Sequence, residues 1–147
     1  MTEEEDSSKF EVMIRELEEK IKEDEEAFYG ERTIKEAYNP KNIGMLVNPD
    51  GAARITDSHG NTMQIHLRVE GNTIRECKFT TDAYGPTVAF GSVITELVKS
   101  KTIEEALRIG EKDIESVLDG LPEDDEHTPE LAVNTLKAAL EGYIKKH

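Results

Sequence analysis

Apolar residues early in the chain recur with a helical period. Five of them lie three or four positions apart among Glu and Lys residues: Phe10, Met13, Ile14, Leu17 and Ile21. This spacing predicts an amphipathic helix from about residue 7 to residue 28, capped by Ser7 or Ser8. A second, short helix is expected from Thr33 to Tyr38, because the Asn39-Pro40 pair that follows disfavours helical backbone.

Between residues 48 and 81 the apolar positions alternate with polar ones, as in a strand with one buried face. The clearest alternation is Met63, Ile65, Leu67 and Val69. Turn-forming residues at 48–51, 59–61 and 70–72 separate three short runs, at 53–56, 63–69 and 74–81. Because connections this short suit antiparallel neighbours, the pattern predicts a three-stranded antiparallel meander.

Beyond Gly85-Pro86 the helical period returns. One apolar face is formed by Val88, Phe90, Val93, Ile94, Leu97 and Val98. Thr102 and Glu105 fit a capping box that opens a further helix, which Gly110 ends, and helices at about 113–118 and 131–144 complete the chain. The order of elements predicts an α+β fold: a three-stranded antiparallel sheet packed against helices, with an extra N-terminal amphipathic helix.

Net charge narrows the classes of function. The 147 residues include 18 Lys and Arg against 32 Asp and Glu, a formal charge of -14. Such a chain repels phosphate backbones and anionic lipids, so we expect no nucleic acid and no membrane, and a basic or neutral protein partner instead. The acidic residues 2–6 and the lack of an apolar run of about 18 residues predict a cytoplasmic protein without a signal peptide.

Cys77 is the only cysteine, so the chain by itself lacks the clustered thiolates of a structural zinc or iron-sulfur site. It shares strand parity with Phe79, which predicts a buried, inert core thiol; the alternative is a cluster ligand shared across a dimer. No nucleophile lies in a catalytic motif and no glycine-rich phosphate loop is present, so an enzyme is not expected.

Three segments resemble the IscU/NifU-type scaffolds of iron-sulfur cluster assembly. They are residues 38–44, residues 96–107, and Leu121-Pro122 followed by His127, Leu131-Ala132 and residues 136–140. The resemblance covers about residues 30 to 145. It divides the chain into an acidic amphipathic extension, residues 1–29, and an IscU/NifU-like scaffold domain, residues 30–147.

The resemblance implies a site at which typical members of the family carry three cysteines, one in each of three neighbouring loops. These cysteines hold a transient [2Fe-2S] cluster. Here His59-Gly60-Asn61 stands for Cys-Gly-Asp, Ala83-Tyr84-Gly85 for Gly-Cys-Gly, and Thr128 for the third cysteine. The chaperone-recognition segment also differs, because Glu123-Asp124-Asp125 follow Leu121-Pro122. The resemblance therefore implies a scaffold-like, non-catalytic accessory or divergent scaffold, partnered by assembly machinery such as a cysteine desulfurase.

The cluster-site positions leave several chemistries open. His59 and His127, with Asp57 or an acid of residues 123–126, suit a single Zn, Fe or Ni ion; otherwise they are loop histidines that face solvent or form hydrogen bonds. Asn61, Tyr84 and Thr128 are expected to fill and polarise the vacated pocket, which would make a small-molecule or anion-binding module at the Gly85-Pro86 helix start. His66 and His147 are expected at the surface.

The N-terminal helix needs something to cover its apolar stripe. The stripe either packs on its own domain, recruits a partner helix or drives a homodimer.

Overall fold

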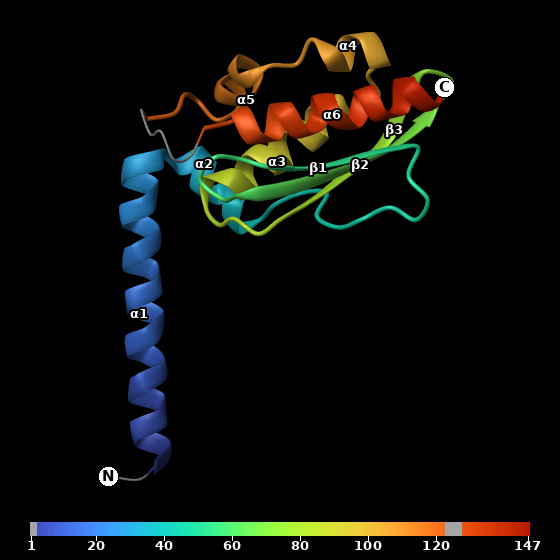
Figure 1. Cartoon of the computed structure of the whole chain (residues 1–147). Coiled ribbons are helices and arrows are strands. Elements are labelled where there is room, and N and C mark those ends of the chain that lie inside the picture. Colours follow the sequence, from blue (N-terminus) through green and yellow to red (C-terminus); the bar gives the residue numbers. More distant parts are fainter. Residues whose placement is uncertain (1–2, 123–127) are drawn as a thin grey trace.

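A three-stranded antiparallel sheet forms one layer of the fold and helices cover one of its faces (Figure 1). The computed structural model describes residues 3–122 and 128–147. The elements in chain order are α1 (Glu3–Tyr29), α2 (Glu31–Tyr38), β1 (Gly51–Thr56), β2 (Thr62–Glu70), β3 (Thr73–Thr81), α3 (Pro86–Val98), α4 (Ile103–Leu107), α5 (Glu111–Val117) and α6 (Glu130–Lys146). The α+β class and the three-stranded meander predicted from the sequence are confirmed.

Strand β2 is central and pairs antiparallel with β1 and β3. The hairpin between β2 and β3 turns at Gly71 and Asn72, both at positive φ, as a two-residue hairpin turn requires. Near that turn the pairing shifts, because Arg68 faces Glu76 while Val69 faces Ile74. Arg75 is thus the extra residue of a β-bulge, which lets Ile74 and Cys77 both point into the core.

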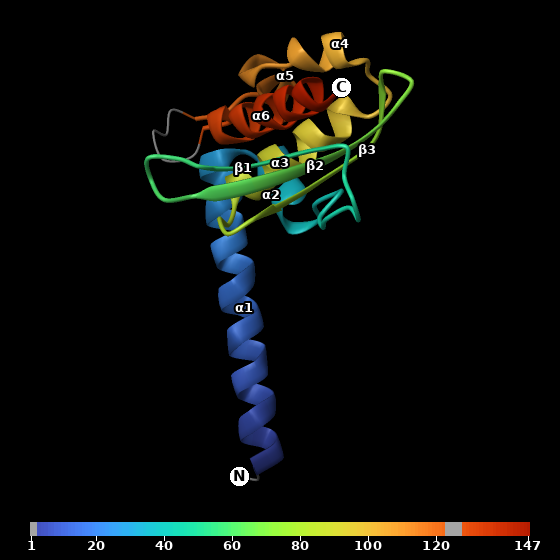
Figure 2. The same cartoon turned by 45° about the vertical axis from the view of Figure 1, so that its right-hand side comes forward.

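The core lies between the sheet and helices α3 and α6. Its fully buried strand residues are Met63, Ile65, Leu67, Ile74, Cys77 and Phe79. Helix α6 lies across β1 and β2, α3 packs on β3, and α4 and α5 lie on the side of these helices that faces away from the sheet (Figures 1 and 2). Gly91 allows α3 to approach closely, since its Cα faces the Phe79 ring.

The opposite face of the sheet is covered by the connection from α2 to β1. Leu46 N donates to His66 Nδ1 at 3.0 Å, and the Arg68 guanidinium donates to the Val47 carbonyl at 2.7 Å. His66 is therefore buried, and the surface position expected from strand alternation is wrong. Alternation separates the two faces of a strand, but it does not reveal that a distant loop folds over one of them.

The Thr102 capping box is confirmed. Glu105 N donates to Thr102 Oγ1 at 3.2 Å, and Thr102 N donates to Glu105 Oε1 at 2.9 Å. Gly110 precedes α5 rather than only ending α4, because its N–H donates to Asp113 Oδ2 at 2.8 Å. Both bonds of the Thr102 capping box lie within four consecutive residues, which is why the sequence alone locates it.

Helix α1 projects away from the domain (Figures 1 and 2). It begins at Glu3, so Ser7 and Ser8 lie inside the helix and the cap expected there is wrong. Its base is held by α2, where Tyr38 Oη donates to Glu25 Oε1 at 3.2 Å and Lys22 Nζ lies 5.2 Å from the Tyr38 ring centroid. The apolar stripe does not pack on the domain: Phe10 is 59% exposed and Leu17 is 54% exposed.

α1 is also the longest helix. Across the described ranges 3–122 and 128–147, none of the helices has the length and apolar character to cross a bilayer.

The close contact between Gly91 and Phe79 leads us to expect that a larger residue at position 91 destabilises the fold. A Cβ at Gly91 would lie 2.5 Å from Phe79 Cδ2, so Gly91→Ala should overpack the core and lower the free energy of unfolding by about 1–3 kcal/mol. Gly142→Ala in α6 is the control, because its Cβ would sit 3.5 Å from the Ala52 carbonyl, and it should stabilise by up to about 1 kcal/mol through helix propensity. Urea titration measures both, and equal effects would contradict the packing account.

Candidate functional site

Two loops meet at the end of the sheet where β1 ends and β2 begins. Residues 57–61 connect β1 to β2, and residues 82–85 lead from β3 into α3. Thr62 N donates to Asp82 Oδ1 at 2.8 Å, and Thr81 Oγ1 donates to the Thr62 carbonyl at 2.6 Å. These bonds hold together the two loops that carry Asn61 and Tyr84.

Asp57 organises the first loop. Its Oδ1 accepts hydrogen bonds from the backbone N–H groups of His59 and Asn61, both at 2.9 Å. Asp57 N donates in turn to the Asn61 carbonyl at 2.8 Å, and Asn61 Nδ2 lies 3.4 Å from Asp57 Oδ2. The Asp57 carboxylate is therefore engaged by its own loop, as in an Asx turn. Asn61 is half-buried against it, and Gly60 takes the positive φ that the turn needs.

A recess of about 260 Å³ lies between this loop and the start of α6. His59 and Thr128 both line it, together with Asp57, Glu130 and Asn134. The fold thus brings the first and third of the sequence-predicted positions to one recess. The side chains around it include an imidazole, two carboxylates, three hydroxyls and an amide, beside the apolar Ile55 and Leu131.

Tyr84 lies apart from that recess. Its side chain is 87% exposed, so it does not fill a pocket, contrary to what the sequence predicted. The following Gly85 has a φ of 62° and its carbonyl accepts from Val88 N at 3.0 Å, which starts α3. Pro86 and Thr87 are buried there, so the side chains of this helix start turn into the core.

His59 is the only one of the two proposed metal ligands that the structure describes, since His127 lies outside the described residues. Over residues 3–122 and 128–147, no three His, Cys, Asp or Glu side chains gather closely enough to hold a metal ion. A metal at His59 and His127 stays a prediction. His147 is at the surface as predicted, where its ring stacks on Tyr143 with centroids 4.5 Å apart.

Cys77 is buried in the core, as predicted. Cys77 pairs with Leu67 of β2. It lies four residues before Thr81, the last residue of β3, at the end of the sheet next to the two loops. Four strand residues span about 13 Å, so the thiol does not reach the recess. Burial raises the pKa of the Cys77 thiol far above its usual range, which disfavours the thiolate that iron would need.

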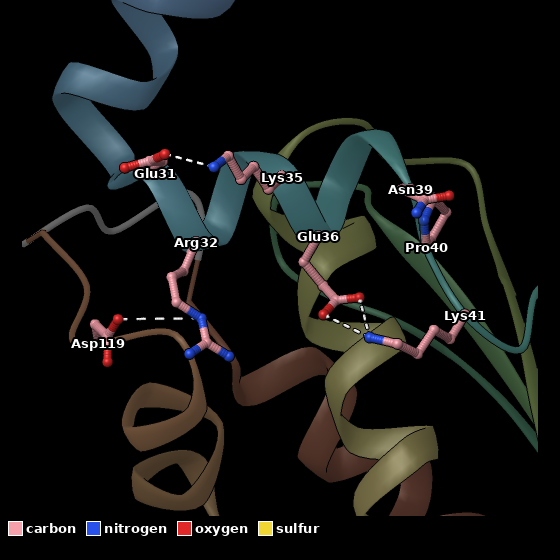
Figure 3. A pocket seen from close by; sticks show the side chains of 8 residues that line it. All are labelled: Glu31, Arg32, Lys35, Glu36, Asn39, Pro40, Lys41 and Asp119. Carbon is pink, nitrogen blue, oxygen red and sulfur yellow. Dashed lines mark hydrogen bonds and ion pairs between the residues drawn. The ribbon is translucent and has the colours of Figure 1, made fainter.

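A second recess, of about 550 Å³, was not predicted from the sequence. It lies beside α2 and includes Asn39, Pro40 and Lys41 of the segment that carries the family resemblance (Figure 3). Lys41 Nζ donates to both Glu36 carboxylate oxygens at 3.0 Å. Ser92 Oγ also donates to Glu36 at 2.8 Å and accepts from Lys41 N at 2.7 Å.

Charges around this second recess are paired. Lys35 is bound to Glu31, and Arg32 lies 4.0 Å from Asp119 (Figure 3). These pairs leave no uncompensated cation among the lining residues, and the bonds of Glu36, Ser92 and Lys41 join α2 to α3. Residues that carry the resemblance at this point therefore have a structural role.

The architecture is that of a small α+β domain, and comparison with known proteins agrees. A solved NifU-like N-terminal domain from Brucella abortus superposes with a TM-score of 0.60 and 18% identity, over 80% of this chain and 94% of that one, which shows the shared fold. The NifU-like N terminal domain family matches residues 28–147. The chain belongs to this family, and the IscU/NifU resemblance is confirmed.

Curated relatives carry the same assignment. The iron-sulfur cluster assembly scaffold protein IscU 1 of Archaeoglobus fulgidus is 33% identical over 120 residues, 81% of this chain and 78% of that protein. The IscU scaffold protein of Haemophilus influenzae is 36% identical over 123 residues, 80% of this chain and 97% of that protein. The similarity therefore spans almost the whole domain and begins where α1 ends.

The hydrogen bonds of Asp57 predict that the protein loses stability when this carboxylate is removed. Asp57→Ala removes the acceptor of two backbone N–H groups, so the free energy of unfolding should fall by about 1–3 kcal/mol and amide exchange at His59 and Asn61 should accelerate. His59→Ala is the control, because it leaves both backbone bonds in place and should change stability by less than about 0.5 kcal/mol. Unchanged exchange in Asp57→Ala would contradict this account of the loop.

Burial of Cys77 predicts its reactivity. Because burial raises the thiol pKa, the native protein should react with a disulfide reagent such as DTNB far more slowly than the urea-unfolded chain, which should release one equivalent of product. Absorbance of the released thiolate measures both rates. Rapid, stoichiometric labelling of the native protein would show an accessible thiol instead.

Proposed function

We propose that this protein is an accessory of iron-sulfur cluster assembly that keeps the scaffold fold and a protein-docking surface but does not hold a [2Fe-2S] cluster through three thiolates. The single observation that carries the proposal is the set of residues at the cluster-site positions: His59, Tyr84 and Thr128 stand where the family resemblance implies cysteines. The one thiol, Cys77, is buried in the core.

The chemistry of these side chains supports a loss of cluster binding. Iron in such clusters prefers soft thiolate ligands. Imidazole replaces thiolate in some clusters, but the Thr128 hydroxyl is a poor substitute and the Tyr84 ring points into solvent. Asp57 and Glu130 at the recess add negative charge beside the anionic sulfides of a cluster. None of these changes alters the helices and sheet that present the domain's outer surfaces.

Docking is the part of scaffold function that these substitutions leave intact. A partner recognises the shape and charge of a surface, whereas cluster assembly requires ligands at one site. The relatives are named as assembly scaffolds, which supports a partner from that machinery, such as a cysteine desulfurase. The protein then acts by binding that partner rather than by catalysis.

A mononuclear metal site is the second candidate. Thr128, which follows His127 in the sequence, lines the same recess as His59, and the recess also carries Asp57 and Glu130. An imidazole pair with a carboxylate suits Zn(II) or Fe(II). The two carboxylates disfavour an anionic ligand in this recess. Unchanged metal content in the double variant His59→Ala, His127→Ala would exclude the metal site.

Restoring the thiolates tests the main proposal. After anaerobic incubation with iron, sulfide and a reductant, the protein should retain no acid-labile sulfide after desalting. The variant with His59→Cys, Tyr84→Cys and Thr128→Cys should retain iron and sulfide in equal amounts and show charge-transfer absorption, because thiolates then stand at all three positions where the family resemblance implies cluster ligands. Iron and sulfide bound in matching amounts by the unmodified chain would contradict the proposal.

A further inference from the structure

We propose that α1 docks a basic amphipathic helix of a partner protein along the seam formed by Phe10, Ile14, Leu17 and Ile21. This seam lies before residues 28–147, which match the scaffold family. It also lies outside the recess that carries His59 and Thr128. The inference therefore goes beyond the proposed function and does not rest on it.

The spacing of the seam is that of a coiled coil. Its residues alternate four, three and four positions apart, with Ile14 and Ile21 at heptad position a and Phe10 and Leu17 at position d. Isoleucine at a with leucine at d favours packing against one other helix. Since α1 has 27 residues, it offers a rod about 40 Å long.

The seam is uncovered in the folded chain. Ile21 is 48% exposed, and Phe10 and Leu17 are more exposed still. Figures 1 and 2 show from two directions that α1 stands clear of the sheet and its covering helices. A partner helix can therefore lie along α1 without meeting the rest of the domain. The seam spans residues 10–21, about 17 Å of the helix, and an exposed apolar stripe on a projecting helix is typical of an interaction site.

A recess of about 440 Å³ lies between α1 and Tyr38, on the flank of the seam. Of the seam residues only Ile21 lines it, and the rest of its α1 wall is Arg15, Glu18, Glu19 and Lys22. Tyr38 is 56% exposed and is fixed in place by its bond to Glu25. The Tyr38 ring therefore flanks the base of the seam near Ile21.

Charge decides which helix fits. Over Glu3–Tyr29 the sequence has twelve Asp and Glu residues against four Lys and Arg residues. Position e, which flanks the seam, is glutamate in three successive heptads: Glu11, Glu18 and Glu25. Lysine or arginine at the facing positions of a partner would pair with these carboxylates, as flanking charges do in coiled coils.

A second copy of α1 fits poorly. In an antiparallel pair the three glutamates at position e would face each other. In a parallel pair Lys20 would meet Glu25 of the other copy, but Asp24 at position d would meet itself inside the apolar seam. Two unpaired carboxylates in such a seam are costly, so the pattern selects against self-association.

The test uses the full chain and two synthetic peptides of four heptads. Both carry Ile at a and Leu at d; one has Lys at e and g, the other has Glu there. We expect the chain alone to sediment as a monomer and to bind the Lys peptide one to one, at least tenfold more tightly than the Glu peptide, with affinity falling as salt rises. Self-association of the chain, equal binding of the two peptides, or binding of neither would overturn the proposal.

Variants locate the interaction. Leu17→Asp should abolish binding of the Lys peptide, whereas Glu16→Gln, at heptad position c away from the seam and the recess, should leave it unchanged. The double variant Glu11→Lys, Glu18→Lys keeps the apolar seam and should reverse the preference toward the Glu peptide. Circular dichroism of each variant confirms that α1 is still helical. An unreversed preference in the double variant would show that these carboxylates do not select the partner.

Discussion

Phe79 is the residue on which the arrangement of the domain depends. Its ring lies under Gly91, which sets how closely α3 packs on β3. Its backbone binds a distant segment, because Phe79 N donates to the Asn42 carbonyl and Gly44 N donates to the Phe79 carbonyl, both at 2.9 Å. Phe79 therefore positions α3, which follows the loop at residues 82–85. It also positions the connection from α2 to β1, which covers the other face of the sheet.

That framework explains how a scaffold fold persists while its ligands change. Helices α3 and α6 and the Asp57 turn hold the loops through packing and backbone hydrogen bonds. None of these contacts uses the side chain of His59, Tyr84 or Thr128. Because the ligand positions contribute little to folding, a family member can exchange thiolates for other side chains and still present the same outer surfaces. The proposed accessory role follows from this separation.

The sequence predicted what is local in the molecule. Helical and strand periods, the Thr102 capping box and the buried Cys77 all depend on neighbours along the chain or on strand parity. Contacts between distant segments determine other features: the burial of His66 and the bulge at Arg75. The projection of α1 reflects the absence of such contacts. The periodicity of the sequence carries no information about contacts between distant segments. The site was predicted only in part for the same reason: the recess beside His59 and the bonds of Asp57 depend on how loops and helices meet.

The proposed role requires the protein to dock with the assembly machinery without carrying a cluster. The most direct measurement is the rate of [2Fe-2S] formation on a cysteine-bearing IscU relative, driven by a cysteine desulfurase, with this protein added in increasing amounts. We expect the rate to fall with added protein and to recover when more desulfurase is supplied, because the protein occupies the partner and accepts no cluster. A rate that is unchanged, or that rises as the protein itself acquires a cluster, would contradict it.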